Sequence, residues 1–283
     1  MIRIFFELAL GIGIVIVIIA FLAEYIDSTL GMGYGTTLTP VLLLIGFNPL
    51  QVVPAVLLSE LITGLLAGFT HHKAGNVNFK PKSTNVLYII KRIKELGYIE
   101  SFKRGVPIHL KIAIVLAACS IFGTLAAVFI SVNLPKFWLN MYIGFLVLVI
   151  GLVILFTINK TYRFSWKKIF SLGLIASFNK GMSGGGYGPV VTGGQLLAGV
   201  KGKSAIGITS LAEGLTCLVG VIAYILSKSI IDWKLAPYLI IGAVLSVPLS
   251  AITVKKIKTR KLTVIIGILT LFLGGFTIIK TIT

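Results

Sequence analysis

GMGYG at residues 31–35 returns 153 positions later as GGGYG at residues 184–188. The correspondence continues without a gap and brings Glu60 onto Glu213. Glycine adopts backbone conformations that other residues avoid, so each cluster is expected to interrupt a helix. A motif of this kind, duplicated within one chain, is typical of transporters built from two internal repeats.

Apolar segments surround both clusters. A helix that spans a bilayer needs about 20 apolar residues, so eight of the segments are long enough to span. The segments at 35–46 and 188–200 are too short, and each directly follows a glycine cluster, which indicates two half-helices. The ten segments are 4–30, 35–46, 49–72, 108–131, 136–158, 167–182, 188–200, 203–227, 234–253 and 261–281.

The composition agrees with this pattern along the whole chain of 283 residues. Apolar residues make up 57% and charged residues only 12%, so no soluble domain can be separated from the rest. We therefore expect an all-α polytopic membrane protein. Cys119 and Cys217 lie within apolar runs, away from any CxxC or histidine cluster, and indicate small buried side chains. The sequence shows no catalytic motif, so we expect neither an enzyme nor a bound cofactor or metal.

The net charge of +18 comes from loops between the apolar runs. This placement indicates attraction to anionic lipids and the setting of membrane topology, not nucleic-acid binding. Basic loops face the cytoplasm, and all the basic loops share one side only if each short segment returns the chain across the membrane. We therefore expect a multi-pass protein of the cell membrane with both termini outside. Residues 1–158 and 159–283 are then two inverted repeats.

Residues 78–107 form a basic insert in the first repeat. Apolar positions between Pro81 and Gly97 could line one face of a short helix on the cytoplasmic leaflet. A role in binding a partner remains the alternative.

The two helix breaks are the candidate substrate site. Free N–H groups at the start of a half-helix, together with its dipole, favour an anion. Irregular backbone at membrane depth requires surrounding protein or a watery cavity. The alternative is close helix packing through small residues. The candidate substrate-binding residues are Gly31, Gly33, Tyr34, Gly35, Thr36, Thr37, Lys180, Ser183, Gly184, Gly185, Gly186, Tyr187 and Gly188.

Four charged residues lie at membrane depth near these breaks. Glu60 and Glu213 occupy the middle of apolar runs, where a carboxylate costs about 2.5–3.5 kcal/mol on insertion, and are candidates for proton coupling or for structural anchoring. Asp27, a third candidate for proton coupling or anchoring, and Lys180 occupy equivalent places before the two glycine clusters. Lys180 could neutralise a bound anion, or it could pair with Asp27, Glu60 or Glu213.

These motifs resemble the TauE/SafE family of sulfite exporters and organosulfur anion permeases. The resemblance covers nearly the whole chain and depends on glycine-rich and polar motifs in a fixed order. Two features depart from the pattern: the insert at 78–107 is longer than the family implies, and Glu60 and Glu213 are acids where many members have small or polar residues. The motifs are 31–35, Pro40 to Gly46 and Pro49, the helix ending at His71, Gly75-Asn76-Val77, 184–188, Gly199, Lys203 to Ala205 and Glu213.

The resemblance implies a transporter of sulfite, sulfonates or related small anions, coupled to the proton gradient. With the internal repeat, it predicts alternating access between two rocking halves. A channel for small anions or small solutes is the alternative. The partners expected are the small anion and anionic lipid on the cytoplasmic face, and the sequence does not fix the oligomeric state.

Overall fold

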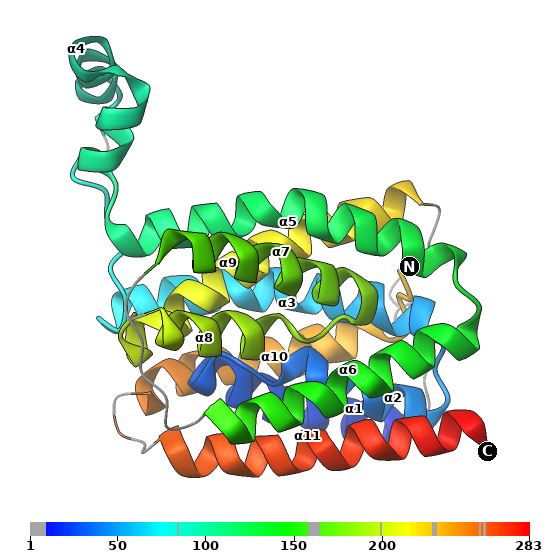
Figure 1. The fold of residues 1–283 in the computed structure, drawn as a ribbon. Helices are drawn as coiled ribbons and strands as arrows, with labels where there is room; N and C mark the ends of the chain where they lie inside the picture. The colour runs from blue at the N-terminus through cyan, green and yellow to red at the C-terminus, as the bar shows by residue number, and fades with distance from the viewer. Residues whose placement is uncertain are drawn as a thin grey trace.

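The computed structural model describes residues 10–83, 85–157, 165–198, 200–227, 231–254, 256 and 259–283. Across these residues the chain is all-helical (Figure 1). The start of the predicted segment 4–30, Gly199 and the basic connections at 158–164, 255 and 257–258 lie outside the described residues. The helices are α1 (Leu10–Leu30), α2 (Tyr34–Ile45), α3 (Pro49–Lys73), α4 (Val86–Gly105), α5 (Ile108–Asn133), α6 (Lys136–Thr157), α7 (Trp166–Ser183), α8 (Tyr187–Leu197), α9 (Gly202–Leu226), α10 (Ala236–Thr253) and α11 (Thr259–Ile282).

The predicted segments are confirmed as helices, but the described residues contain six helices that are long and apolar enough to span a bilayer where the sequence predicted eight. The six helices are α1, α3, α5, α6, α9 and α10. The eight long apolar runs each form a helix of at least 18 residues. The two short segments form α2 and α8, which have 12 and 11 residues. Large apolar side chains such as Phe122, Phe129 and Phe156 are more than 70% exposed on the outside of the bundle, as a lipid-facing surface requires. The protein is therefore a multi-pass membrane protein.

Four helix pairs form the bundle. α1 packs along α10, α5 along α7, α3 against α9, and α6 against α11. Small residues allow the central pair to approach closely, because a Cβ added at Gly64 of α3 would lie 2.7 Å from the backbone nitrogen of Gly214 of α9. This central crossing places the middles of α3 and α9, which carry Glu60 and Glu213, side by side.

The two short helices leave the centre toward opposite ends of the bundle. At one end, Lys280 near the C-terminus donates to the carbonyl of Leu44 in α2 (2.6 Å). At the other end, Ser204, in the first turn of α9 that follows α8, donates to the carbonyl of Asn76, which lies just after α3 (3.4 Å). Figure 1 accordingly shows α8 in the half of the bundle nearer α4 and α2 in the half nearer the C-terminus.

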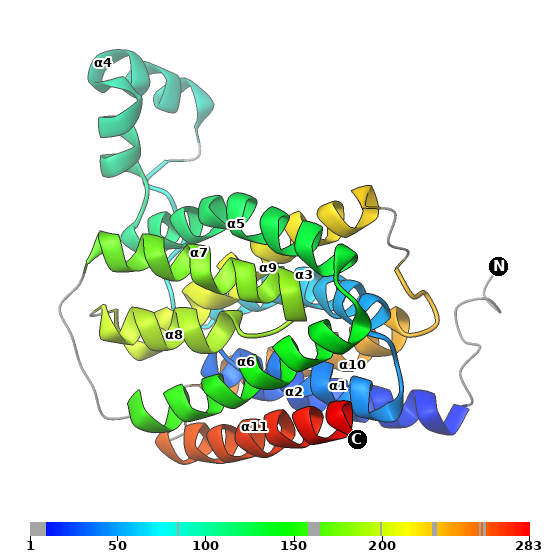
Figure 2. The same ribbon diagram turned by 45° about the vertical axis from the view of Figure 1, so that its right-hand side comes forward.

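The basic insert differs from the prediction in length. Asn85 caps α4 by accepting from the backbone N–H groups of Leu87 and Tyr88, as a helix start requires. Gly97, with φ 76° and ψ 166°, interrupts the helix, but the chain becomes helical again as far as Gly105. The insert is thus a bent helix that stands away from the bundle beside the start of α5 (Figure 1 and Figure 2). The prediction of a helix ending at Gly97 was too short, since a glycine stop signal does not reveal whether a second helix follows.

Candidate functional site

The two helix breaks meet at the centre of the bundle. A Cβ added at Gly35, in the first turn of α2, would lie 1.8 Å from the carbonyl oxygen of Gly184. A Cβ added at Gly185 would lie 2.7 Å from the carbonyl carbon of Gly35. Only glycine permits backbones to approach this closely. The duplicated motif therefore brings the two breaks into direct contact.

Backbone geometry explains why each break begins where it does. Gly33 has φ 138° and Gly186 has φ 78°, and each directly precedes the tyrosine that starts a short helix. Residues with a side chain rarely adopt these angles. The chain can therefore leave α1 or α7 and restart as α2 or α8 within three residues.

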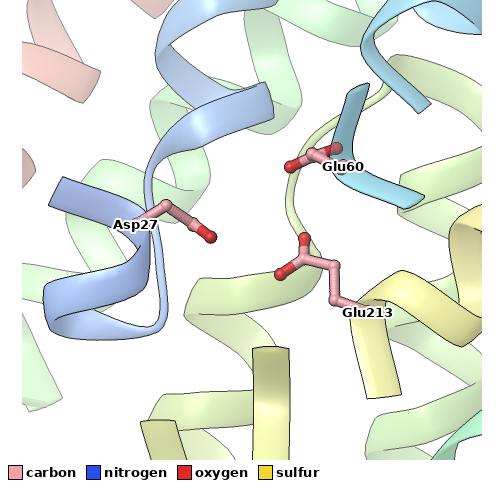
Figure 3. A group of neighbouring side chains, drawn as sticks. All are labelled: Asp27, Glu60 and Glu213. Carbon is pink, nitrogen blue, oxygen red and sulfur yellow. The ribbon is translucent and has the colours of Figure 1, made fainter. Parts of the chain in front are cut away.

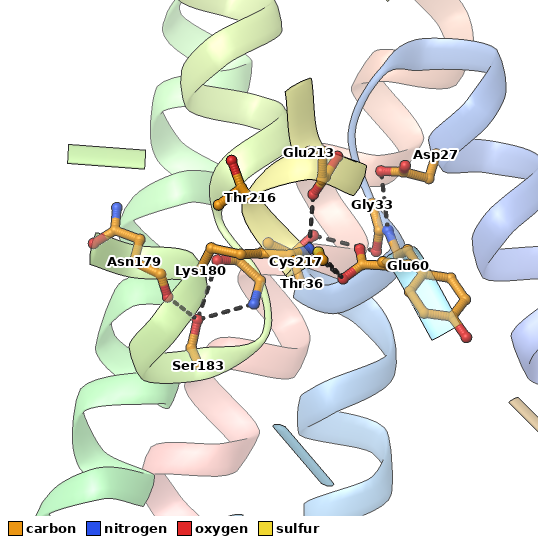
Figure 4. A network of polar contacts seen from close by, with 12 residues as sticks. Asp27, Gly33, Thr36, Glu60, Asn179, Lys180, Ser183, Glu213, Thr216 and Cys217 are labelled. Carbon is orange, nitrogen blue, oxygen red and sulfur yellow. Dashed lines mark hydrogen bonds and ion pairs between the residues drawn. The ribbon is translucent and has the colours of Figure 1, made fainter. Parts of the chain in front are cut away.

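A buried ion cluster lies beside the breaks. Lys180, in the last turn of α7, is fully buried and extends between two acids, as Figure 4 shows. Its Nζ donates to Oε1 of Glu213 at 2.7 Å and pairs with Oε2 of Glu60. Of the alternatives that the sequence left open, pairing with Glu60 and Glu213 is the one that this conformation adopts.

Two further acids extend the cluster from α1. Asp27 accepts from the backbone N–H of Tyr34 at 3.3 Å, so its carboxylate caps the start of α2 across the break. Glu24 is 2% exposed and accepts from the hydroxyls of Ser28 (2.6 Å) and Thr63 (3.1 Å). Four carboxyl groups and one ammonium group thus share a buried region at membrane depth.

The cluster encloses one small cavity of about 10 Å³, close to the space of a single water molecule. Asp27, Glu60 and Glu213 point toward it from α1, α3 and α9 (Figure 3), and each offers an oxygen within 4.8 Å of the other two. Carboxylate oxygens at this spacing can hold a proton or a small cation. The lining residues are Glu24, Asp27, Glu60, Thr63, Gly64, Ala67, Ser210 and Glu213.

Comparison with known proteins decides the family. The family described as "Sulfite exporter TauE/SafE" matches residues 16–88 and 95–277. The chain belongs to the TauE/SafE family. It is also 27% identical, over 281 residues, to the "Probable membrane transporter protein YtnM" of Bacillus subtilis (strain 168), which covers 94% of this chain and 83% of that protein. The chain is thus a membrane transporter of the TauE/SafE family.

In this TauE/SafE protein the predicted site residues lie close together. Gly31 accepts from Thr192 of α8 (2.6 Å), and a Cβ added at Gly188 would lie 2.6 Å from the same carbonyl oxygen of Gly31. Thr36 and Thr37 both donate to the carbonyl of Gly33, and Thr37 alone of the predicted set is partly exposed. The two breaks therefore hold each other in this conformation.

Two of the predicted side chains make hydrogen bonds within the protein, whereas the hydroxyl of the buried Tyr187 has no hydrogen-bond partner among the described residues. Ser183 donates to the carbonyl of Asn179 (2.8 Å) and accepts from the N–H of Gly185 (3.1 Å). The hydroxyl of Tyr34 shares a hydrogen bond with Ser59 (2.8 Å), and Tyr187 is fully buried. These side chains brace the breaks, so a substrate could reach them only if the breaks separated.

Sequence reasoning missed Glu24. Its sequence signal is the same as that of Glu60, an acid within an apolar run. Ser59 and Thr63, which tie α3 to Tyr34 and Glu24, carried no sequence signal, because single hydroxyl residues are common in membrane helices.

Proposed function

We propose that this TauE/SafE protein transports a small sulfur-containing anion, such as sulfite or a sulfonate, by proton-coupled alternating access. The name of the family supports the substrate class. The observation that carries the proposal is the buried Lys180, which lies where the two helix breaks meet and is the positive end of the ion cluster.

The anion would bind between the starts of α2 and α8. Residues 33–37 and 185–190 would supply backbone N–H groups and the positive ends of two helix dipoles. Lys180 would supply the full positive charge, and Tyr34 and Tyr187 would offer hydroxyls or act as gates. Because the breaks touch in this conformation, it corresponds to a closed state, and binding would require them to separate.

Coupling would follow from the two partners of Lys180. When a bound anion pairs with the ammonium group of Lys180, Glu60 and Glu213 lose the positive charge that they share. An unpaired buried carboxylate is costly, and removing one partner of a buried ion pair costs about 3–5 kcal/mol. Protonation of Glu60 or Glu213 would avoid that cost, so each anion would move together with a proton. Asp27, which caps α2, would transmit the change to the break.

Two inverted repeats, residues 1–158 and 159–283, would provide the moving parts. In such an arrangement α1, α2, α3, α5 and α6 of the first repeat correspond, in this order, to α7, α8, α9, α10 and α11 of the second. The helix packing supports this correspondence. It converts the α1–α10 pair into the α7–α5 pair, and it converts the α3–α9 and α6–α11 pairs into themselves. The opposite directions of α2 and α8 support it as well. In inverted repeats the substrate lies at the interface between the halves, which here is the contact between the breaks.

The tight contact between the breaks supports a carrier in preference to the channel alternative. A channel needs a continuous pore, whereas the backbones of Gly35 and Gly184 touch at the centre of this molecule. The basic loops and α4 would face the cytoplasm at the plasma membrane. There, the lysines and arginines of α4 would contact anionic lipid.

The proposal is tested with purified protein in liposomes. We expect saturable sulfite flux that follows an imposed pH gradient and that falls to background in Lys180→Gln. Lys167→Gln, at the exposed start of the same helix, is the matched control and should retain flux. Sulfite flux that Lys180→Gln leaves intact would exclude Lys180 from the site. Folded wild-type protein that moves other small anions but not sulfite would show that the proposed substrate is wrong.

A further inference from the structure

Three carboxylates from three helices converge on one small space. Asp27 of α1, Glu60 of α3 and Glu213 of α9 each place an oxygen within 4.8 Å of the other two (Figure 3). The cavity between them measures about 10 Å³, which accommodates one water molecule or one small ion and is too small for a sulfur oxyanion. All three residues are at least 93% buried.

The charge of this region is unbalanced. Lys180 of α7 is the single cationic group that faces the cluster in the described part of the chain, and it pairs with Glu60 and Glu213. Asp27 and Glu24 add two more carboxyl groups from α1. The other titratable neighbours are Tyr34 of α2, Tyr187 of α8 and Cys217 of α9, which are neutral when protonated. Buried charges normally find partners, so the surplus of acids favours a bound cation or protons.

One oxygen atom marks where such an ion would bind. Oε2 of Glu60 pairs with Lys180, but Oε1 of the same carboxylate is buried and has no hydrogen-bond partner. An acceptor left unsatisfied in a protein interior costs free energy that a bound ion would recover. Glu60 lines the cavity together with Asp27 and Glu213, whose oxygens are only partly used by Tyr34 and Lys180.

The position in the fold also favours a cation. Asp27 lies in the last turn of α1, where the carbonyl groups at a helix C-terminus carry partial negative charge. Interrupted helices in transporters use such C-terminal ends for cations and the following N-terminal ends for anions. The cation and the anion would therefore occupy opposite sides of the same break.

We propose that Asp27, Glu60 and Glu213 bind one sodium ion, which competes with protons for the same oxygens. Oxygen ligands suit a hard cation. Calcium takes six to eight oxygen ligands, and magnesium keeps several water molecules in a near-ideal octahedron. A cavity of about 10 Å³ leaves no room for the water molecules that would complete either set. The site extends the proposed function by naming a second coupling ion, but its occupancy requires no anion and can be measured without one.

The test is thermal unfolding of the full-length protein in detergent, without any sulfur anion and at one fixed alkaline pH. Choline chloride is replaced stepwise by NaCl at constant ionic strength. A ligand that binds only the folded protein raises its stability with concentration. We expect Tm to rise by about 2–4 °C or more and to saturate, and to rise less with KCl.

Two variants locate the effect. Asp27→Asn keeps an oxygen that can accept from Tyr34 and removes one charged ligand, so the sodium response should be lost. Glu95→Gln, on the exposed insert, should keep the full response. The proposal is overturned if wild-type Tm is the same in NaCl and choline chloride, if KCl acts equally, or if Asp27→Asn responds as the wild type does. None of these outcomes depends on sulfite flux, so the sodium site and the anion site can fail separately.

Discussion

Gly35→Ala is the smallest change that should disturb the contact between the two breaks. The added Cβ would lie 1.8 Å from the carbonyl oxygen of Gly184 and 2.6 Å from its carbonyl carbon. Cβ atoms essentially never come within 3.0 Å of such atoms, and the obstacle is backbone that cannot rotate away. The start of α2 and the break before α8 would have to part by more than about 1 Å.

Such overpacking typically costs about 1–3 kcal/mol. Alanine recovers at most about 1 kcal/mol of this through its higher helix propensity. Because the obstacle is backbone, the cost lies at the upper end of this range, and the net loss of about 2 kcal/mol corresponds to a fall in Tm of roughly 4–8 °C. Because the same contact would have to open and close during transport, we also expect the sulfite flux to decrease.

The assay is thermal unfolding of the purified variant in detergent, beside Gly275→Ala. Gly275 lies within α11, and a Cβ added there meets no atom within 4 Å, so its Tm should stay equal or rise slightly. If Gly35→Ala unfolds at the temperature of Gly275→Ala, the breaks do not touch as described.

Two further predictions concern the ion cluster and the topology. Lys180→Gln should unfold at a lower temperature than wild type at neutral pH, because Glu60 and Glu213 lose their counter-charge. This deficit should shrink on acidification, when the carboxylates take up protons, and a deficit that does not depend on pH would contradict the pairing. In whole cells, an impermeant maleimide should label Asn48→Cys but should label Lys94→Cys only after permeabilisation, and the reverse pattern would invert the topology. Cys119 and Cys217 are buried and should give little background labelling.

The sequence predicted the order and length of the helices well because local signals determine them. Apolar runs of sufficient length define the long helices, and the glycines at 31–35 and 184–188 mark the breaks. Gly46 ends α2 in the left-handed conformation that glycine favours, close to the predicted boundary. The insert was predicted less well, since its second helical stretch after Gly97 follows a stop signal.

The site could be predicted only in part. Asp27, Glu60, Lys180 and Glu213 stood out individually, because charge at membrane depth is costly. Which of them pair depends on how α3, α7 and α9 pack, since Lys180 lies 120 residues from Glu60 in the sequence. The contact of Gly35 with Gly184 likewise depends on the packing of the two halves, so the sequence indicated the breaks but not that they touch.

Counterflow tests the central claim most directly. Liposomes containing the protein are loaded with unlabelled sulfite and diluted into a trace of labelled sulfite, with no pH gradient or membrane potential. A carrier with alternating access should accumulate label inside transiently above the external concentration, and Lys180→Gln should not. A channel would only equilibrate the label, so saturable flux without this overshoot would contradict alternating access at the contact between the two breaks.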